Sequence, residues 1–536
     1  METVAVVLGL ITLAVVVATL ASRLRAPAPS LLVIAGLLVG LIPAIPPILV
    51  PPDLIGLVVL PPLLYAAAID VSVPELRAVL RPIIALVIGL VGVTALVVAA
   101  VTHAISPQVP LAAAFVLGAI LASTDPVAVS ALARRLRLRP RLLALVQGES
   151  LLNDATSLVL FRVAVAVVVA GGGVGAWQVG QKLVWLGGVG ALIGWVLAVF
   201  VEQLRRRTHD PVLETVLALV TPYIVYLAAE SVKSSGVTAV VICGLRLSRR
   251  RHSVTRGPSR LQIDHAYAVV VFLLESVVFA LIGLEIPGLV ERLRDTDQRF
   301  ILPALVVTVA LLVTRVLWVF PTGLLGRHTS RGIGGSSWGE LAVLSWAGTR
   351  GVVPLAAALA IPLTTAAGQP FPERDFLQVM AITCIALTLV VQGLTLDPLV
   401  RRLDVREDSD DMRHQRALTQ HELTVAALAR LDELMPSGQE PDPPAVKTLR
   451  EDLERQEWAS RAELDRAFGP DSEEQPPTFT SEAYRRLRLE LLATEHSELI
   501  RLREERVVGE RVSREFQRQL DLEEARLREH PPEDRQ

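Results

Sequence analysis

The residues of this chain that could do chemistry are ionisable side chains standing inside long apolar runs. A charge at the centre of a bilayer costs at least about 2.5 kcal/mol, so each such residue is a functional candidate. The first 403 residues are built from apolar runs of about the 20 residues that a bilayer crossing needs. These runs hold seven candidates, namely Asp125, Glu149, Asp154, Arg162, Glu275, Arg315 and Arg350.

The run AFVLGAILASTDPVAVSAL contains a proline next to one of these carboxylates. Pro126 cannot donate to the carbonyl of Ala122, and its ring pushes against the preceding turn. The helix is therefore expected to break here, with Thr124 and Asp125 at the break. Backbone groups freed within a membrane are tolerated only where they line a cavity or are buried in protein. The simpler alternative is a proline kink satisfied by its threonine.

The next run, LVQGESLLNDATSLVLF, carries polar residues at helical spacing. Ser150 stands four residues before Asp154, and Asn153 four before Ser157, so these groups share one side of a helix. That side cannot face lipid. Hard oxygen donors of this kind suit a small hard cation, and no histidine or cysteine accompanies them. Polar contact between helices is the alternative for the two serines.

A second interrupted run, LAVLSWAGTRGVVPLAAALAI, surrounds Arg350 with Gly348, Gly351 and Pro354. It predicts a second broken helix. Paired broken segments in two inverted halves of a chain point to a transporter's site, because half-helix ends present partial charges there. Asp125 is then suited to positive half-helix ends and Arg350 to negative ones.

The elements that must position these groups are thirteen predicted helices. Alternate loops between them hold 22 and 6 basic residues, and this bias places the N-terminus outside and the tail in the cytoplasm. Helices five and twelve are an odd number apart, so they cross in opposite directions, as two inverted six-helix repeats around a linker helix would require. The helices are expected near residues 3–21, 28–43, 54–69, 82–103, 110–133, 142–170, 183–201, 211–229, 235–247, 266–286, 301–320, 339–362 and 375–399.

The last 133 residues differ in charge from the first 403. Residues 1–403 hold 31 basic and 21 acidic residues, a net +10, whereas residues 404–536 hold 21 and 33, a net −12. We therefore predict a transmembrane domain over 1–403 and a charged cytoplasmic helical domain over 404–536. The whole is an all-α polytopic membrane protein, which excludes a soluble enzyme, and a net charge of −2 does not favour nucleic acid as a partner.

The tail shows three-four spacing of apolar residues with charges between them, as in amphipathic helices. Helical segments are expected near 411–435, 445–467 and 481–527, with Gly509 dividing the last one. Because its charge is opposite to that of the cytoplasmic basic loops, we expect the tail to dock on them. A solvated helix hairpin, a dimer contact and a regulatory role are the alternatives.

Four stretches together resemble the monovalent cation/proton antiporters, the family of prokaryotic sodium/proton antiporters and eukaryotic sodium/proton exchangers. The resemblance implies that Asp154 binds cation and proton alternately, with Asn153 beside it. It also implies that Thr124, Asp125 and Ser150 supply further ligands for a monovalent cation. The stretches are ASTDPVAVSAL (122–132), GESLLNDATSLVLF (148–161), FLLESVVFALIGLEI (272–286) and GTRGVVPLAAAL (348–359).

The same resemblance carries further expectations. An Asn-Asp pair goes with electroneutral exchange in that family, and position 153 is Asn. The family pairs the glutamate of its GES segment with an arginine of the broken helix, which implies a structural ion pair of Glu149 with Arg350. Glu275 and Ser157 are secondary candidates for the site. A homodimer in the cell membrane is also expected.

The function that these features predict is secondary antiport of sodium, or of potassium or lithium, against protons by alternating access. A partly desolvated carboxylate at Asp154 would let protons and cations displace one another. No nucleotide-binding motif G-x-x-x-x-G-K-[ST] occurs, so an ion gradient must drive transport, and we expect no cofactor and no enzymatic activity. A passive cation channel and a proton-coupled carrier of organic solutes are the alternatives.

Overall fold

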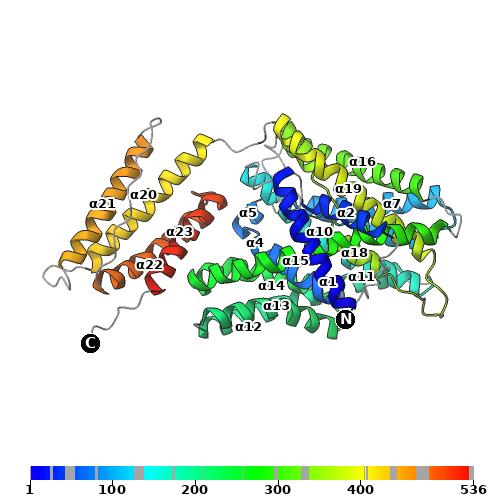
Figure 1. Ribbon diagram of the computed structural model, residues 1–536, viewed down its shortest axis with the longest axis horizontal. Coiled ribbons are helices and arrows are strands. Elements are labelled where there is room, and N and C mark those ends of the chain that lie inside the picture. Colours follow the sequence, from blue (N-terminus) through cyan, green and yellow to red (C-terminus); the bar gives the residue numbers. More distant parts are fainter. Residues whose placement is uncertain are drawn as a thin grey trace. The chain divides into compact units, whose positions relative to one another are not determined.

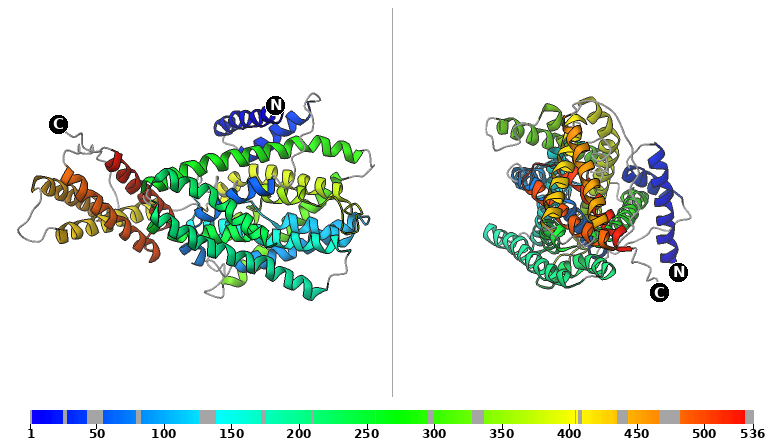
Figure 2. Two further views of the ribbon diagram at one scale, coloured as in Figure 1. Left: turned by 90° about the horizontal axis from the view of Figure 1, so that it is seen from below. Right: turned by 90° about the vertical axis from the view of Figure 1, so that its left-hand side faces the viewer.

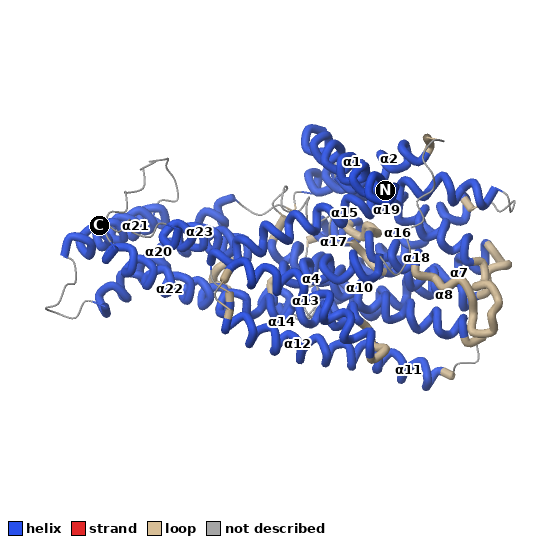
Figure 3. Tube along the Cα trace, turned by 60° about the horizontal axis from the view of Figure 1, so that its bottom comes forward, coloured by secondary structure: helices blue, strands red, loops and turns tan. Residues whose placement is uncertain are grey.

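In the computed structural model, the chain is helical almost throughout its described residues, and Figure 3 accordingly contains only helices and loops. An isolated bridge joins Thr364 and Pro370. The structure describes residues 2–24, 28–42, 55–78, 83–125, 138–171, 175–208, 210–255, 257–294, 300–327, 337–403, 405, 409–434, 443–465 and 482–529.

The helices before the tail follow the apolar runs (Figure 1). Each of the thirteen stretches expected to be helical contains a helix in the structure. The bounds are α1 (Glu2–Leu24), α2 (Ala28–Gly40), η1 (Ile55–Val59), α4 (Leu60–Asp70), α5 (Val73–Ala78), η2 (Ala85–Leu90), α7 (Val91–Ile105), α8 (Leu111–Ala122), α10 (Pro140–Val169), α11 (Ala176–Val184), η3 (Trp185–Val189), α12 (Gly190–Arg207), α13 (Pro211–Ser231), α14 (Gly236–Val254), α15 (Gly257–Arg294), α16 (Ile301–Arg327), α17 (Trp338–Trp346), α18 (Val352–Leu359) and α19 (Arg374–Leu403).

Seven helical stretches among the described residues are long and apolar enough to cross a membrane. Shorter apolar helices add to them at 8–21, 28–40, 56–70 and 111–122. The chain is therefore a multi-pass membrane protein, while the number of thirteen crossings stays a prediction. The long stretches are Val87–Ile105, Arg141–Val169, Trp177–Arg207, Pro211–Ser231, Gly257–Gly288, Ile301–Gly323 and Arg374–Leu403.

The chain forms two compact units. The first comprises residues 1–204, 217–249 and 266–406, and contains all the candidate site residues named above. The second comprises the tail from residue 407 together with two short stretches, 205–216 and 250–265, where α12 to α15 end or begin.

The described residues of the tail form four helices: α20 (Ser409–Leu434), α21 (Pro443–Asp465), α22 (Glu482–Glu504) and α23 (Glu510–Glu529). They lie side by side in Figure 2, coloured from gold to red. The predicted division of the last segment at Gly509 is confirmed, because α22 ends before this residue and α23 begins after it. The apolar positions expected from the spacing form their cores, which include Leu487, Leu491, Leu499, Leu502, Val512, Phe516 and Leu520.

The short helix α8 is the element on which the site depends. From Ala113 to Ala122 almost every residue of this helix is buried, and all of them are apolar or small. Gly118 lets it approach α7 closely, since a Cβ atom there would lie 2.2 Å from the carbonyl oxygen of Ala95. Small residues permit this kind of close helix packing in membranes. The last residue of α8 is thus held in a fixed place inside the first unit.

Candidate functional site

The first break occurs at the end of α8. The helix ends at Ala122, and Ser123 has an extended backbone with φ −66° and ψ 144°. Pro126 accounts for this ending, because it removes a donor and disfavours helical geometry in the residue before it. The continuation of the predicted fifth helix, residues 126–133, lies outside the described residues.

The second break separates α17 from α18. A capping box starts α17: the Ser337 hydroxyl accepts from the N–H of Glu340, and the Glu340 carboxylate accepts from the N–H of Ser337. Arg139, at the start of α10, donates to Glu340 Oε1 over 2.8 Å. The chain leaves the helix after Trp346 and resumes at Val352, so the predicted interruption around Arg350 is confirmed.

The two breaks cross and satisfy each other's polar groups. The N–H of Asp125 donates to the Thr349 carbonyl over 2.8 Å, and the Thr349 hydroxyl donates to the Asp125 carbonyl over 3.1 Å. The Arg350 guanidinium donates to the Ser123 carbonyl over 2.8 Å. Unwound backbone inside a membrane protein requires such partners. Arg350 therefore serves the carbonyl end of α8, which is the negative half-helix end expected for it.

Asp125 lies at the start of α18, where the crossing is closest. A Cβ atom on Gly351 would lie 1.5 Å from Asp125 Oδ2, so a larger residue at this position would displace the Asp125 carboxylate. Gly351 precedes the first residue of α18, whose free N–H groups carry the positive end of the helix dipole. The carboxylate is placed where that partial charge favours it.

Asp154 faces the first break from α10. The Ser123 hydroxyl donates to Asp154 Oδ1 in a short hydrogen bond, and Asp154 is only 5% exposed. The Thr124 hydroxyl donates to Ser150 Oγ over 3.2 Å and accepts from Asn153 Nδ2 over 3.1 Å. The structure thus brings four residues that the sequence singled out into one hydrogen-bonded group: Asp154 through Ser123, and Thr124, Ser150 and Asn153 directly.

The predicted ion pair of Glu149 with Arg350 is wrong. Glu149 pairs with Arg315 of α16, whose two terminal nitrogens lie 2.5 and 2.9 Å from the two carboxylate oxygens. Both side chains are almost fully buried. Arg350 instead donates through Nη1 to the Ser123 carbonyl at the crossing. Arg315 also reaches the carbonyls of Leu344 and Ser345, so it closes the end of α17 as well.

Asn153 connects this ion pair to the crossing. Its amide nitrogen lies 3.2 Å from Glu149 Oε1 and 3.1 Å from Thr124 Oγ1, so it donates to both. Its amide oxygen is buried and has no hydrogen-bond partner among the described residues. A buried acceptor of this kind is costly unless something binds it. Together with the Asp154 carboxylate and the hydroxyls, it forms an oxygen-rich donor set of the kind that hard cations prefer.

Three further candidates are Ser157, Glu275 and Arg162. The Ser157 hydroxyl donates to the Asp154 carbonyl over 3.2 Å within α10, which is a local helix contact. Glu275 lies on α15 and is partly buried. Arg162, one turn further along α10, forms a bidentate pair with Glu230 of α13. Ser123 and Thr349 were missed by sequence reasoning, although both adjoin residues that it named.

Comparisons with known proteins agree with one another. The family described as sodium/hydrogen exchanger, transmembrane, matches residues 10–402. An uncharacterized Na+/H+ exchanger of Mycobacterium tuberculosis is 37% identical over 533 residues, which is 97% of this chain and 96% of that protein. A sodium, potassium, lithium and rubidium/H+ antiporter of Bacillus pumilus is 33% identical over 395 residues, 70% of this chain and 58% of that protein.

A solved structure shows the same fold. The sodium proton antiporter MjNhaP1 from Methanocaldococcus jannaschii matches with a TM-score of 0.61 at 21% sequence identity. The match covers 76% of this chain and 99% of the other.

Proposed function

Since this chain belongs to the sodium/hydrogen exchanger family, we propose that it exchanges a monovalent cation for protons at Asp154. Sodium is the proposed cation, and potassium and lithium are the alternatives that the name of the Bacillus pumilus relative keeps open. The observation that carries the proposal is a buried carboxylate facing the crossing of two broken helices.

The charges around the crossing distinguish Asp154 from its neighbour Glu149. The charge of Glu149 is balanced by Arg315, and it accepts a further hydrogen bond from Asn153. Asp154 accepts from the Ser123 hydroxyl, and no ion pair joins it to a side chain in the described part of the chain. A buried carboxylate without a fixed counter-charge needs a proton or a bound cation. The two therefore compete for one site, and this competition is the basis of exchange.

The ligand set that we propose comprises Asp154, Asp125, Thr124 and Ser150, with the free amide oxygen of Asn153 beside them. All of these residues are buried, so a cation bound there would exchange its water shell for protein oxygens. We further propose that exchange is electroneutral. Position 153 carries an uncharged amide whose nitrogen is committed to Glu149 and Thr124, so the site has one carboxylate fewer to carry a second proton.

The number and direction of the membrane crossings are proposed from the apolar runs and basic loops of the sequence. Thirteen crossings in two inverted repeats would put the breaks at the midplane, where alternating access can expose Asp154 to either side in turn. The basic loops place the N-terminus outside and the tail in the cytoplasm. We propose a transport domain over 1–403, a cytoplasmic domain over 404–536, a homodimer, and residence in the cell membrane.

Docking of the tail on cytoplasmic basic residues is part of the same proposal. Support comes from the second compact unit, in which Arg260 at the start of α15 forms an ion pair with Asp521 of α23. Arg260 belongs to a predicted cytoplasmic loop and Asp521 to the tail, so the pair joins a basic and an acidic part of the chain, as their opposite net charges favour.

Proton flux in proteoliposomes tests the transport function. A pulse of sodium, potassium or lithium should move protons across vesicles that contain the wild-type protein. Asp154→Asn should abolish this flux, because an amide can neither release a proton nor balance a cation. Asp397→Asn, which alters an ion pair with Arg401 on α19, is the matched control and should transport normally. Wild-type flux from the Asp154→Asn protein would exclude Asp154 as the shared site.

A further inference from the structure

A buried arginine joins the start of α15 to the tail. Arg260 holds the Asp521 carboxylate with two nitrogens, Nε to Oδ2 at 3.2 Å and Nη2 to Oδ1. Both side chains are 5% exposed. One turn earlier, the N–H of Gly257 donates to Glu524 Oε2 over 3.1 Å. Two carboxylates of α23, one turn apart, thus bind the first turn of α15.

Asp521 keeps its charge throughout the physiological range. Burial raises the pKa of this carboxyl, but its polar and charged neighbours His496, Arg260 and Gln517 outweigh burial and bring it down to about 2. A carboxyl with a depressed pKa loses its contribution only as the pH falls through that depressed value. Any change in the contact between pH 5 and 8 must therefore come from another group.

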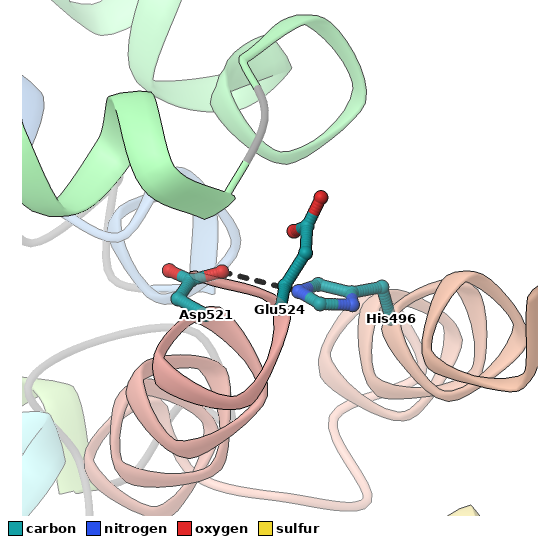
Figure 4. Close-up of side chains that lie close together, drawn as sticks. All are labelled: His496, Asp521 and Glu524. Atoms are coloured by element: carbon teal, nitrogen blue, oxygen red, sulfur yellow. Dashed lines mark hydrogen bonds and ion pairs between the residues drawn. The ribbon is translucent and has the colours of Figure 1, made fainter. Parts of the chain in front are cut away.

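His496 of α22 is the titratable neighbour. Its Nδ1 lies 2.8 Å from the Leu492 carbonyl, which can only accept, so Nδ1 carries a hydrogen. Its Nε2 lies 3.0 Å from Arg260 Nη2 and 3.1 Å from Asp521 Oδ1. In the neutral ring, Nε2 holds a lone pair and accepts from Arg260. Figure 4 shows His496, from α22, facing Asp521 and Glu524 of α23.

His496, Asp521 and Glu524 could form a metal site by their spacing, but their contacts argue against one. Their ligand atoms lie within 4.8 Å of one another, which is a spacing that an ion could use. The guanidinium of Arg260, however, already contacts both Asp521 Oδ1 and His496 Nε2. Glu524 accepts from the backbone of Gly257. The cationic partner of the cluster is thus part of the chain.

A proton and Arg260 compete for the same atom. Protonated Nε2 can no longer accept from Arg260, and it places a second positive charge 3.0 Å from the guanidinium. The protonated Nε2 would instead donate to Asp521 Oδ1, which lies 3.1 Å away within the tail, and so compete with Arg260 for that oxygen. The adjacent Glu495 changes this little, because Arg488 balances its charge over 2.7 Å. Protonation therefore weakens the contact of the tail with Arg260.

We propose that His496 makes the docking of the tail on the start of α15 pH-dependent, held when the ring is neutral and loosened as the cytoplasm acidifies. Imidazole is the side chain suited to this task, because it changes charge between pH 5 and 8. The inference rests on the proposed cytoplasmic placement of the tail. It adds a proton-sensitive element outside the transport site.

Hydrogen–deuterium exchange on the full-length protein in lipid nanodiscs tests the proposal. The peptide to follow covers residues 250–265, so that the N–H of Gly257, which bonds Glu524, lies inside it. Wild type, His496→Gln and His414→Gln are compared at pH 8 and at pH 5.5. The peptide is the same in all three, so the intrinsic effect of pH on exchange cancels. His414 lies on α20 of the same tail and is exposed, which makes it the matched histidine control.

Wild type and His414→Gln should lose protection of this peptide on acidification by about tenfold, the equivalent of one hydrogen bond to a charged group. His496→Gln should keep its protection, since glutamine can accept from Arg260 but cannot take up the proton. An equal loss in His496→Gln and wild type would overturn the switch, and so would no loss in wild type.

Docking itself is tested separately. Arg260→Gln should lower protection of the peptide at both pH values, while Arg249→Gln, an exposed arginine on α14, should not. Unchanged α20 peptides would show that the tail still folds. Full protection in Arg260→Gln would overturn docking, whatever His496 does. The Asp154→Asn protein should show the wild-type profile, so a failure of the transport proposal would leave this result intact.

Discussion

The partner of Glu149 can be decided by two double-mutant cycles. Arg315 and Glu149 are 4% and 1% exposed and share two hydrogen bonds of 2.5 and 2.9 Å. Replacing Arg315 by methionine leaves a buried carboxylate with Asn153 as its remaining donor. It also removes the donors that serve the carbonyls of Leu344 and Ser345. Removing one partner of a buried ion pair costs about 3 to 5 kcal/mol.

The double variant should lose less unfolding free energy than the two single variants lose together. In Glu149→Gln/Arg315→Met, neither charge is left alone, so we expect a coupling energy of about 2 to 3 kcal/mol. Glu149→Gln combined with Arg350→Met should show a coupling of about 1 kcal/mol or less, because Arg350 is held by the Ser123 carbonyl.

The measurement is unfolding of the purified protein in mixed micelles with increasing SDS, followed by tryptophan fluorescence. The chain has seven tryptophans to report the transition. Each single and double variant is compared at one protein concentration. A coupling of Glu149 with Arg350 that equals or exceeds its coupling with Arg315 would refute the assignment of the pair.

Three further variants probe other parts of the chain. Gly351→Ala should abolish both stable folding and exchange, because its Cβ would overlap Asp125, whereas Gly92→Ala, with nothing within 4 Å, should be tolerated; similar thermal stability of the two variants would contradict the crossing. Asn153→Asp should make exchange respond to a clamped membrane potential, and a flux that ignores the potential would count against the proposed electroneutrality. Arg488→Met should destabilise the tail by about 3 to 5 kcal/mol, since Arg488 is buried between Glu495 and Glu523. Limited proteolysis would detect this, with the exposed Arg461→Met as control, and equal resistance of both variants would argue against it.

Local chemistry explains which parts of the site could be predicted from the sequence. Pro126 and the pair of glycines around Arg350 interrupt apolar runs, and such interruptions act on the backbone within a few residues. The four-residue spacing of Ser150 and Asp154 is likewise a property of one helix. These signals located both breaks and the group around Asp154 before any tertiary contact was known.

Pairing across helices could not be predicted in the same way. Two buried arginines were available to Glu149, and nothing in the spacing distinguishes Arg315 from Arg350. The choice follows from the crossing, where the Ser123 carbonyl engages one of them. Arg260 and Asp521 are 261 residues apart, so opposite net charge indicated their docking but not the residues.

The crossing also limits how the protein can move. Separating the two breaks would strand the N–H of Asp125, the carbonyl of Ser123 and the hydroxyl of Thr349 inside the protein, at about 1 to 3 kcal/mol for each buried group. Ser123 also donates a hydrogen bond to Asp154, so α10 is linked to the two breaks as well. We therefore expect the ligands of the proposed site to move together as a rigid group during a transport cycle, with the remaining helices moving around them.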